Sequence, residues 1–456
     1  MTNAAVSGSV PRCVSARKGR GTMGSSRKLM VATLVGLLTL VVAATFVTGC
    51  GESQSTTTTG APSSSTETTS AQSTETSGAP SGELPADAPE LLIGVDASLS
   101  SFLAPFGAYQ TWAQQAAVDD RNAAGGIVVD GKAHRVKLVI YDDKSDGNVA
   151  ATNVDTLITK DKVVAVLGPI VPTVGNPAAL AAERRGIPYL QTGNPLEVFR
   201  EVTEWQWAFT FFVQLVDGSD TVFASVDEVK AQTNGRVALC VDNSPDGPGQ
   251  LAGWKAMAEK YGWEAVEMPA FPMGTTDFGS LISSLKSANC DFVCVMADTP
   301  DLIALRKQMD AAGYKPKILQ FARGAQVQQF ADALGSLADG VMHFSYWSPD
   351  LPYPGAAELG KRYQESVGQS IGQIVGPEYA AAQILMDAIA KAGTTDPAAI
   401  RDAIAATDGT YVCGPVKFAE DHTSVMPSLQ FQWQGGKAVI VWTKDVANGS
   451  LLFPLP

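Results

Sequence analysis

The stretch that decides the fold begins LLIGVD (Leu91–Asp96) and ends with the strand-like segment His134–Asp143. The first segment is almost continuously apolar, which is typical of a parallel strand buried on both faces. From Tyr109 onward, apolar residues recur at the spacing of one helical face, and Gly125–Gly126 can end that helix in a left-handed conformation. A strand, a helix and a second strand in this order predict one right-handed crossover unit with parallel strands.

Strands and helices alternate in the same way through most of the chain, in two successive series. Further strands are expected at Val163–Gly168, Ile187–Thr192, Trp205–Phe212, Arg236–Asp242, Trp263–Met268, Phe292–Ala297, Ile318–Ala322 and Val341–Tyr346. Helices are expected at Asn148–Lys160, Asn176–Arg185 (capped by Asn176, with Pro177 first), Gly218–Ala231, Pro248–Lys260, Asp277–Ala288, Thr299–Ala312, Tyr353–Ser366, Pro377–Ala392 and Asp396–Ala406. Leu429–Gln434 and Ala438–Trp442, joined by Gly435–Gly436, predict a hairpin at the edge of the second sheet. The pattern predicts an α/β protein with two lobes and mostly parallel sheets.

The charge of the chain is divided unevenly between its start and the rest. Six of the 33 basic residues and none of the acidic residues precede position 50, so the remainder carries 27 basic and 46 acidic residues, a formal charge of −19. Such an acidic surface argues against binding to nucleic acids or to anionic membranes.

The first fifty residues carry targeting signals. The apolar stretch Leu29–Val47 follows basic residues and leads into Val47-Thr48-Gly49-Cys50, which resembles the lipobox of bacterial lipoproteins. We therefore expect a signal peptide at 1–49 and lipidation of Cys50; a permanent transmembrane helix is the alternative. Residues 50–89 are rich in Ser, Thr, Gly and Pro and predict a disordered tether. Either reading places the body outside the membrane, on its extracytoplasmic face.

Enzymatic signatures are not evident in the sequence. The three histidines, His134, His343 and His422, keep no metal-ligand spacing with cysteines or carboxylates, and no nucleophile elbow, phosphate-binding loop or HExxH motif occurs. We expect no covalent chemistry, no cofactor and no metal. A hydrolase on a two-lobed scaffold stays as a distant alternative.

Several segments resemble one family when taken in order. They are Asn122–Ile127 (NAAGGI), Tyr141–Asp143 (YDD), Thr276–Leu281 (TDFGSL), Leu285–Asn289 (LKSAN) and Gly414–Phe418 (GPVKF). Together they resemble the branched-chain amino-acid-binding proteins of ABC importers, which have the type I periplasmic binding fold. The resemblance runs from about Leu91 to Trp442.

This resemblance implies an architecture and partners. It implies two Rossmann-like lobes, 90–209 plus 347–413 and 210–346 plus 414–456, joined by three hinge crossings near Thr210, Ser345 and Gly414. A small organic ligand, amino-acid-like or carboxylate-bearing, would be enclosed between the lobes and delivered to a membrane permease. The same fold can instead report a ligand to a signalling receptor, and the sequence does not separate the two.

The candidate binding residues of the first lobe follow its predicted strands, because ligands bind beyond the carboxyl ends of parallel strands. They are Ser100, Ser101, Phe106, Val171, Thr173, Gln191, Thr192 and Gly193. The resemblance places Ser100 and Thr173 near a ligand carboxylate and Phe106 over the ligand. A helix cap or a turn is the alternative role for Ser100 and Thr173, and plain packing is the alternative for Phe106.

The second lobe departs from the family pattern. Asp246 stands where amino-acid binders carry a Tyr, and Arg323 lies where they place an acidic residue that meets the ligand ammonium. A cation at that position argues against ordinary amino acids, unless Asp246 or Asp298 supplies the missing charge. Arg323 itself would suit a carboxylate, or it is an exposed loop residue. Trp347 could wall the ligand or pack the hinge.

Overall fold

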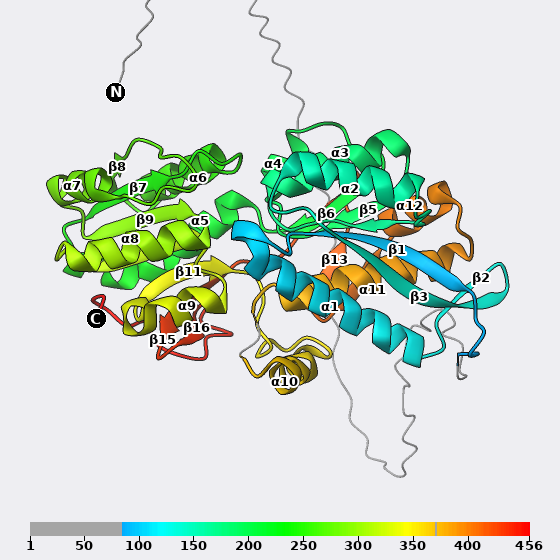
Figure 1. Ribbon diagram of the computed structural model, residues 1–456. Helices are drawn as coiled ribbons and strands as arrows, with labels where there is room; N and C mark the ends of the chain where they lie inside the picture. The colour runs from blue at the N-terminus through cyan, green and yellow to red at the C-terminus, as the bar shows by residue number, and fades with distance from the viewer. Residues whose placement is uncertain (1–83, 370–371) are drawn as a thin grey trace, which may run out of the picture. The chain divides into compact units, whose positions relative to one another are not determined.

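The computed structural model describes residues 84–369 and 372–456 (Figure 1). The predicted signal peptide, Cys50 and most of the predicted tether lie outside these residues. All described residues belong to one compact unit. Within it the strands form two seven-stranded sheets and one two-stranded sheet.

The first sheet has the strand order β14-β6-β5-β4-β1-β3-β2. Its strands are β1 (Glu90–Ala97), β2 (Ile127–Val129), β3 (Lys132–Asp142), β4 (Val166–Leu167), β5 (Tyr189–Gln191), β6 (Ala208–Phe212) and β14 (Thr423–Val425). All neighbours pair in parallel except β2 and β3, which form a hairpin. The predicted parallel pairing of β1 with β3 is confirmed. Strand β2 was not predicted from the sequence.

Helices α1 (Ala104–Ala123), α2 (Gly147–Thr159), α3 (Pro172–Arg185), α4 (Leu196–Arg200), α11 (Val375–Ala392) and α12 (Pro397–Ala405) accompany this sheet, after the short 3₁₀ turn η1 (Ser101–Leu103). The prediction that α3 begins at Asn176 is wrong. The hydrogen bonding of α3 starts earlier, because the Gly175 N–H donates to the Val171 carbonyl at 2.8 Å. Pro172 occupies the first turn and Pro177 lies inside the helix. Gly186 ends α3 with φ of 65°, as predicted.

The second sheet has the order β16-β15-β11-β10-β9-β7-β8. Its strands are β7 (Arg236–Val241), β8 (Glu264–Glu267), β9 (Phe292–Ala297), β10 (Ile318–Arg323), β11 (Val341–Ser345), β15 (Leu429–Gln434) and β16 (Lys437–Trp442). Every residue of β9 and β10 is buried, which fits strands covered on both faces. The predicted hairpin is confirmed: Gly435 and Gly436 have φ of 59° and 76°, and β16 is the edge strand.

The helices between these strands are α5 (Leu215–Val226), α6 (Gly247–Lys260), α7 (Gly279–Ala288), α8 (Thr299–Ala311) and α9 (Gln328–Leu334), with 3₁₀ turns η2 (Asp227–Gln232) and η3 (Gly335–Ala338). Helix α10 (Ala356–Val367) follows β11 and packs against α1 of the first lobe. Helix α8 contacts α9 and β9, whereas Arg362 of α10 forms an ion pair with Asp120 of α1 at 2.7 Å. Helix α9 was not predicted, because it spans only seven residues.

The chain passes between the two sheets three times. The first passage follows β6 and the second follows β11, close to the predicted crossings at Thr210 and Ser345. The third lies later than the predicted position at Gly414. Strand β14 pairs with β6, Thr423 opposite Thr210, so the chain leaves the first sheet only after Val425. The intervening β12 (Asp408–Tyr411) and β13 (Gly414–Lys417) form their own two-stranded sheet.

Candidate functional site

A pocket lies where strands of both sheets end. Its walls come from residues at or just beyond the carboxyl ends of β4, β5, β6, β7, β9, β10 and β11, together with the start of α1. The lining residues are Phe106, Ile170, Val171, Gly193, Pro195, Phe212, Leu215, Asp246, Gln250, Met296, Arg323, Gln326, Phe344 and Tyr346. This is the position at which parallel α/β sheets bind ligands.

The first-lobe wall of the pocket is apolar. Of the residues predicted there, the structure brings together Phe106, Val171 and Gly193. Val171 adopts φ of 74°, a conformation that a β-branched residue rarely takes, and it does so at the residue before helix α3. Four aromatic rings line the pocket, Phe106 and Phe212 from the first lobe and Phe344 and Tyr346 from the second, and they give it a largely apolar and polarisable lining.

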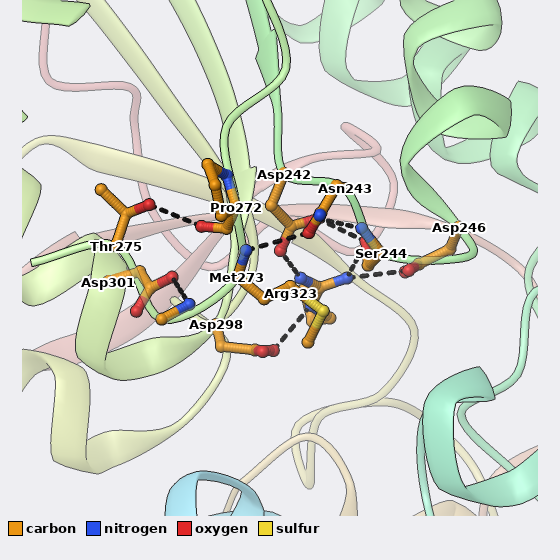
Figure 2. Close-up of polar contacts among 11 residues, drawn as sticks. Asp242, Asn243, Ser244, Asp246, Pro272, Met273, Thr275, Asp298, Asp301 and Arg323 are labelled. Atoms are coloured by element: carbon orange, nitrogen blue, oxygen red, sulfur yellow. Dashed lines mark hydrogen bonds and ion pairs between the residues drawn. The ribbon is translucent and has the colours of Figure 1, made fainter. Parts of the chain in front are cut away.

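Arg323 is the centre of an ion-pair cluster in the second lobe (Figure 2). Its Nη1 donates to Asp246 Oδ1 at 2.8 Å and to Ser244 Oγ at 2.9 Å, and its Nη2 donates to Asp242. Its Nε lies 2.9 Å from Asp298 Oδ1. Asp242, Asp246 and Asp298 follow β7 or β9, so the topology of the sheet brings all three to the end of β10.

The electrostatics of this cluster keep Arg323 charged and leave an excess of negative charge. Burial lowers the pKa of Arg323, but the ion pairs with Asp246, Asp298 and Asp242 raise it by more. Burial raises the pKa of Asp298 to about 6, although Arg323 opposes this shift. One guanidinium faces three carboxylates, so the cluster has a formal charge of −2 when all three are ionised.

The backbone around Arg323 is shaped to hold this arrangement. Arg323 adopts φ of 60°, a backbone conformation that residues other than glycine disfavour. A Cβ atom on the next residue, Gly324, would lie 2.4 Å from the backbone nitrogen of Thr299, so no larger residue fits there. The loop after β10 therefore lies close to the loop after β9, and this close approach brings Arg323 against Asp298.

Other predicted residues of the first lobe serve the protein's own hydrogen bonds. The Ser100 hydroxyl donates to Asp142 Oδ2 at 2.7 Å, and Ser101 is exposed. Gln191 accepts from the Tyr189 hydroxyl at 2.9 Å, and Thr192 donates to Glu378. Thr173 lies in the first turn of α3 and does not line the pocket. The Ser100 side chain makes no helix-capping hydrogen bond, and its bond to Asp142 joins its loop to the end of β3 instead.

Trp347 and Asp298 lie next to the pocket without lining it. The Trp347 indole donates to the Val412 carbonyl at 2.8 Å and borders a separate hollow of about 170 Å³ with Phe431 and Trp433. Asp298 reaches the pocket only through its contact with Arg323. Hinge packing, the alternative for Trp347, is therefore what its hydrogen bond supports.

Several residues of the pocket were not predicted from the sequence. Gln250, Gln326 and Met296 were not singled out, nor were Phe212 and Phe344. Gln250 lies in the helix that follows β7, and Gln326 lies three residues beyond β10. Their positions after predicted strands were the available signal, but Gln and Phe are too common for residue type alone to select them.

The described residues offer no evident metal site. Among 84–369 and 372–456, no three His, Cys, Asp or Glu side chains are grouped in a way that could hold a metal ion. No helix in these ranges has the length and apolar character needed to cross a membrane. The apolar stretch Leu29–Val47 lies outside them.

Two α/β lobes whose parallel strands end at one shared pocket define a class, the two-lobed solute-binding proteins. A family model described as periplasmic binding protein matches residues 90–438. The chain belongs to this family of solute-binding proteins, and its fold is the type I periplasmic binding fold.

Individual relatives are distant but cover most of the chain. The Leu/Ile/Val-binding protein homolog 7 of Brucella abortus is 25% identical over 392 residues, which cover 82% of this chain and 96% of the relative. A leucine-binding protein from Thermotoga maritima has a TM-score of 0.70 at 18% identity, covering 77% of this chain and 97% of that one. A branched-chain amino acid transporter substrate-binding protein from Streptococcus pneumoniae, solved with isoleucine, has a TM-score of 0.69 at 24% identity, covering 80% and 100%.

Proposed function

We propose that this protein captures a small organic solute between its two lobes on the extracytoplasmic face of the cell membrane and delivers it to the permease of an ABC importer. The observation that carries the proposal is the pocket at the strand ends of both sheets, because its lining comes from both lobes. A ligand that contacts both lobes at once stabilises their closure, which is how a two-lobed protein signals occupancy.

The lining supports a ligand with an apolar body and a polar group that faces the second lobe. The apolar residues come from both lobes, whereas Asp246, Gln250, Arg323 and Gln326 all belong to the second. The expectation that Arg323 anchors a ligand carboxylate loses support, because Arg323 is already paired with three carboxylates. Asp246, the alternative charge for meeting an ammonium, does line the pocket.

A thermal-shift screen of amines, amino acids and organic acids tests solute binding. A ligand held only by the native state raises the free energy of unfolding by RT ln(1 + [L]/Kd), about 2.7 kcal/mol at a hundredfold excess over Kd. Small-angle scattering with and without the best ligand then tests closure. A radius of gyration that does not change on saturation would contradict the two-lobe mechanism.

Membrane anchoring through Cys50 is a separate part of the proposal, since it rests on the lipobox resemblance and lies outside the described residues. Expressed in a bacterium that processes lipoproteins, the protein should fractionate with membranes, and Cys50→Ser should release it. Membrane association that persists in Cys50→Ser would favour a permanent transmembrane helix instead.

Sensing remains the competing role, because the fold can also present a bound ligand to a receptor. Reconstitution with a candidate permease in proteoliposomes distinguishes the two. Ligand uptake that depends on this protein and on ATP supports transport; a ligand-dependent complex with a signalling receptor, without uptake, supports sensing. Turnover of a bound ligand by the purified protein would instead revive the hydrolase alternative.

A further inference from the structure

The polar side chains at the pocket are mostly hydrogen-bond acceptors, and the geometry determines which way their amides point. Gln250 is fully buried, and its Nε2 donates to Ser219 Oγ at 3.0 Å. Ser219 uses its own proton on the Leu215 carbonyl at 2.7 Å, so its oxygen must accept. The Gln250 nitrogen is therefore correctly placed, and its Oε1 has no hydrogen-bond partner among the described residues.

The amide of Gln326 also has only one possible orientation. Its Nε2 donates to the Phe344 carbonyl at 2.9 Å, and a carbonyl can only accept, so the amide cannot be reversed. Gln326 thus turns its nitrogen toward the protein backbone and keeps its oxygen as an acceptor. With the Asp246 carboxylate, three acceptor groups from the second lobe line one pocket.

Few donors line the pocket to balance these acceptors. Arg323 faces three carboxylates: its Nη1 donates to Asp246 and Ser244, its Nη2 donates to Asp242, and its Nε lies 2.9 Å from Asp298 Oδ1 without forming a hydrogen bond within the described residues. The Tyr346 hydroxyl can accept as well as donate. On the first lobe, Thr192 is turned to Glu378 and Ser100 to Asp142, and helix α3 begins with Pro172, which has no N–H.

We propose that the pocket takes an organic ammonium ion with an apolar body, and that a carboxylate on the ligand is not required for binding. The ammonium meets Asp246, Gln250 and Gln326, next to a cluster with an excess of negative charge. The apolar body packs against Phe106, Phe212 and Phe344, whose ring faces also attract cations. This inference rests on the proposed solute-binding function and narrows its ligand class.

Matched sets of ligands test the inference by calorimetric titration of the purified full-length chain. Isopentylamine, leucine and isocaproate share the same isobutyl group and carry an amine, both groups, or a carboxylate, respectively. Phenethylamine, phenylalanine and hydrocinnamate form a second, larger set. We expect each amine to bind within about tenfold of its amino acid and the acids to bind about a hundredfold more weakly or not at all.

Two variants test the residues named. Gln250→Met removes one acceptor and leaves the Arg323 cluster intact, so amine affinity should fall about 10- to 100-fold, as expected for a lost hydrogen bond to a charged group. Asp246→Asn should weaken amine binding at least as much and strengthen isocaproate binding, because Arg323 then loses one carboxylate partner. Asp155→Asn, which makes the same charge change at a surface ion pair, is the control and should stay within about twofold.

Several outcomes would overturn the inference. Leucine binding more than about a hundredfold tighter than isopentylamine would show that the carboxylate is needed. Isocaproate binding as well as the amine, or amine affinity unchanged in both variants, would contradict the acceptor assignment. Each of these results leaves solute binding itself intact. If neither amine binds, the inference fails, and the wider ligand screen decides the solute-binding function separately.

Discussion

The two faces of the pocket use their polar residues differently. In the first lobe, the polar side chains that follow the strands bond to the protein itself: Ser100 to Asp142, and Thr192 to Glu378. In the second lobe, Asp246, Gln250 and Gln326 line the pocket and keep acceptor capacity. A polar residue beyond a strand end therefore marks a site only if its hydrogen bonds are not already satisfied within the fold.

The largest effect on stability is expected from removing the cation of the second lobe. Arg323→Ala leaves three nearly buried carboxylates without their counter-ion, and we expect a loss of about 3–5 kcal/mol in the free energy of unfolding, measured by chemical denaturation. Arg362→Ala breaks the ion pair with Asp120, whose side chains are 37% and 49% exposed, and should cost less than about 1 kcal/mol. Equal losses would mean that the Arg323 cluster contributes no more than a surface pair.

In the first lobe, the corresponding buried ionisable group is the carboxyl of Glu378. Its Oε2 accepts from Gln114 at 2.8 Å, and burial raises its pKa to about 7. The folded state therefore holds a proton that the unfolded state releases near pH 4.3. This contribution to stability is fully present below pH 4.3 and is lost as the pH rises through 7, by about 3–4 kcal/mol in total.

Glu378→Gln tests this, because the variant cannot lose a proton. The stability difference between the wild type and Glu378→Gln should change by about 2–3 kcal/mol between pH 5 and pH 8, in favour of the variant at the higher pH. Chemical denaturation at both values measures it. The exposed Glu358→Gln is the control, and a pH dependence equal to that of the control would contradict the prediction.

A smaller effect concerns the charge of the second-lobe cluster during binding. Burial raises the pKa of Asp298 to about 6, so Asp298 is ionised at pH 7.5 and largely protonated at pH 5. Protonation removes one negative charge from the cluster of Asp242, Asp246 and Arg323. We expect the affinity for isopentylamine to fall roughly three- to tenfold from pH 7.5 to pH 5, measured by calorimetry. Asp298→Asn should flatten this dependence, and an affinity that rises at low pH would refute the sign.

The smallest effect is expected at Ser100. Ser100→Ala removes a hydrogen bond to Asp142 in an exposed loop, so stability should fall by about 0.5–1 kcal/mol and ligand affinity should change less than about twofold. Phe106→Ala, in the same lobe, removes a pocket wall and should weaken binding far more. If Ser100→Ala weakened binding as much as Phe106→Ala, Ser100 would contact the ligand after all.

Much of the fold could be predicted, and the errors have physical causes. Long apolar strands such as β9 and β10 carry a strong signal, because burial on both faces demands apolar residues throughout. The early start of α3 was missed because proline favours the first turn of a helix, and Pro177 was taken as that first residue. Pro172 satisfies the same preference five residues earlier. The late third crossing was missed because β14 has only three residues and is defined by its pairing with β6.

Some of the residues singled out in the sequence line the pocket. Asp246 and Arg323 were selected as charged residues after strands, and both line the pocket. Their relation was not predicted: Arg323 donates a hydrogen bond to Asp246. Nothing in the residue spacing shows that the loops after β7, β9 and β10 converge on one guanidinium, because strand order is a property of the folded sheet.

The sequence by itself determined that the chain alternates strands and helices in two series and that its loops after the strands carry the candidate residues, since apolar periodicity and glycine and proline signals act locally. Only the tertiary structure decided which of those residues face a common pocket and which form hydrogen bonds or ion pairs within the protein instead. Hydrogen bonds and ion pairs join residues far apart in the chain, such as Asp246 and Arg323. Their availability to a ligand therefore depends on packing that no local pattern encodes.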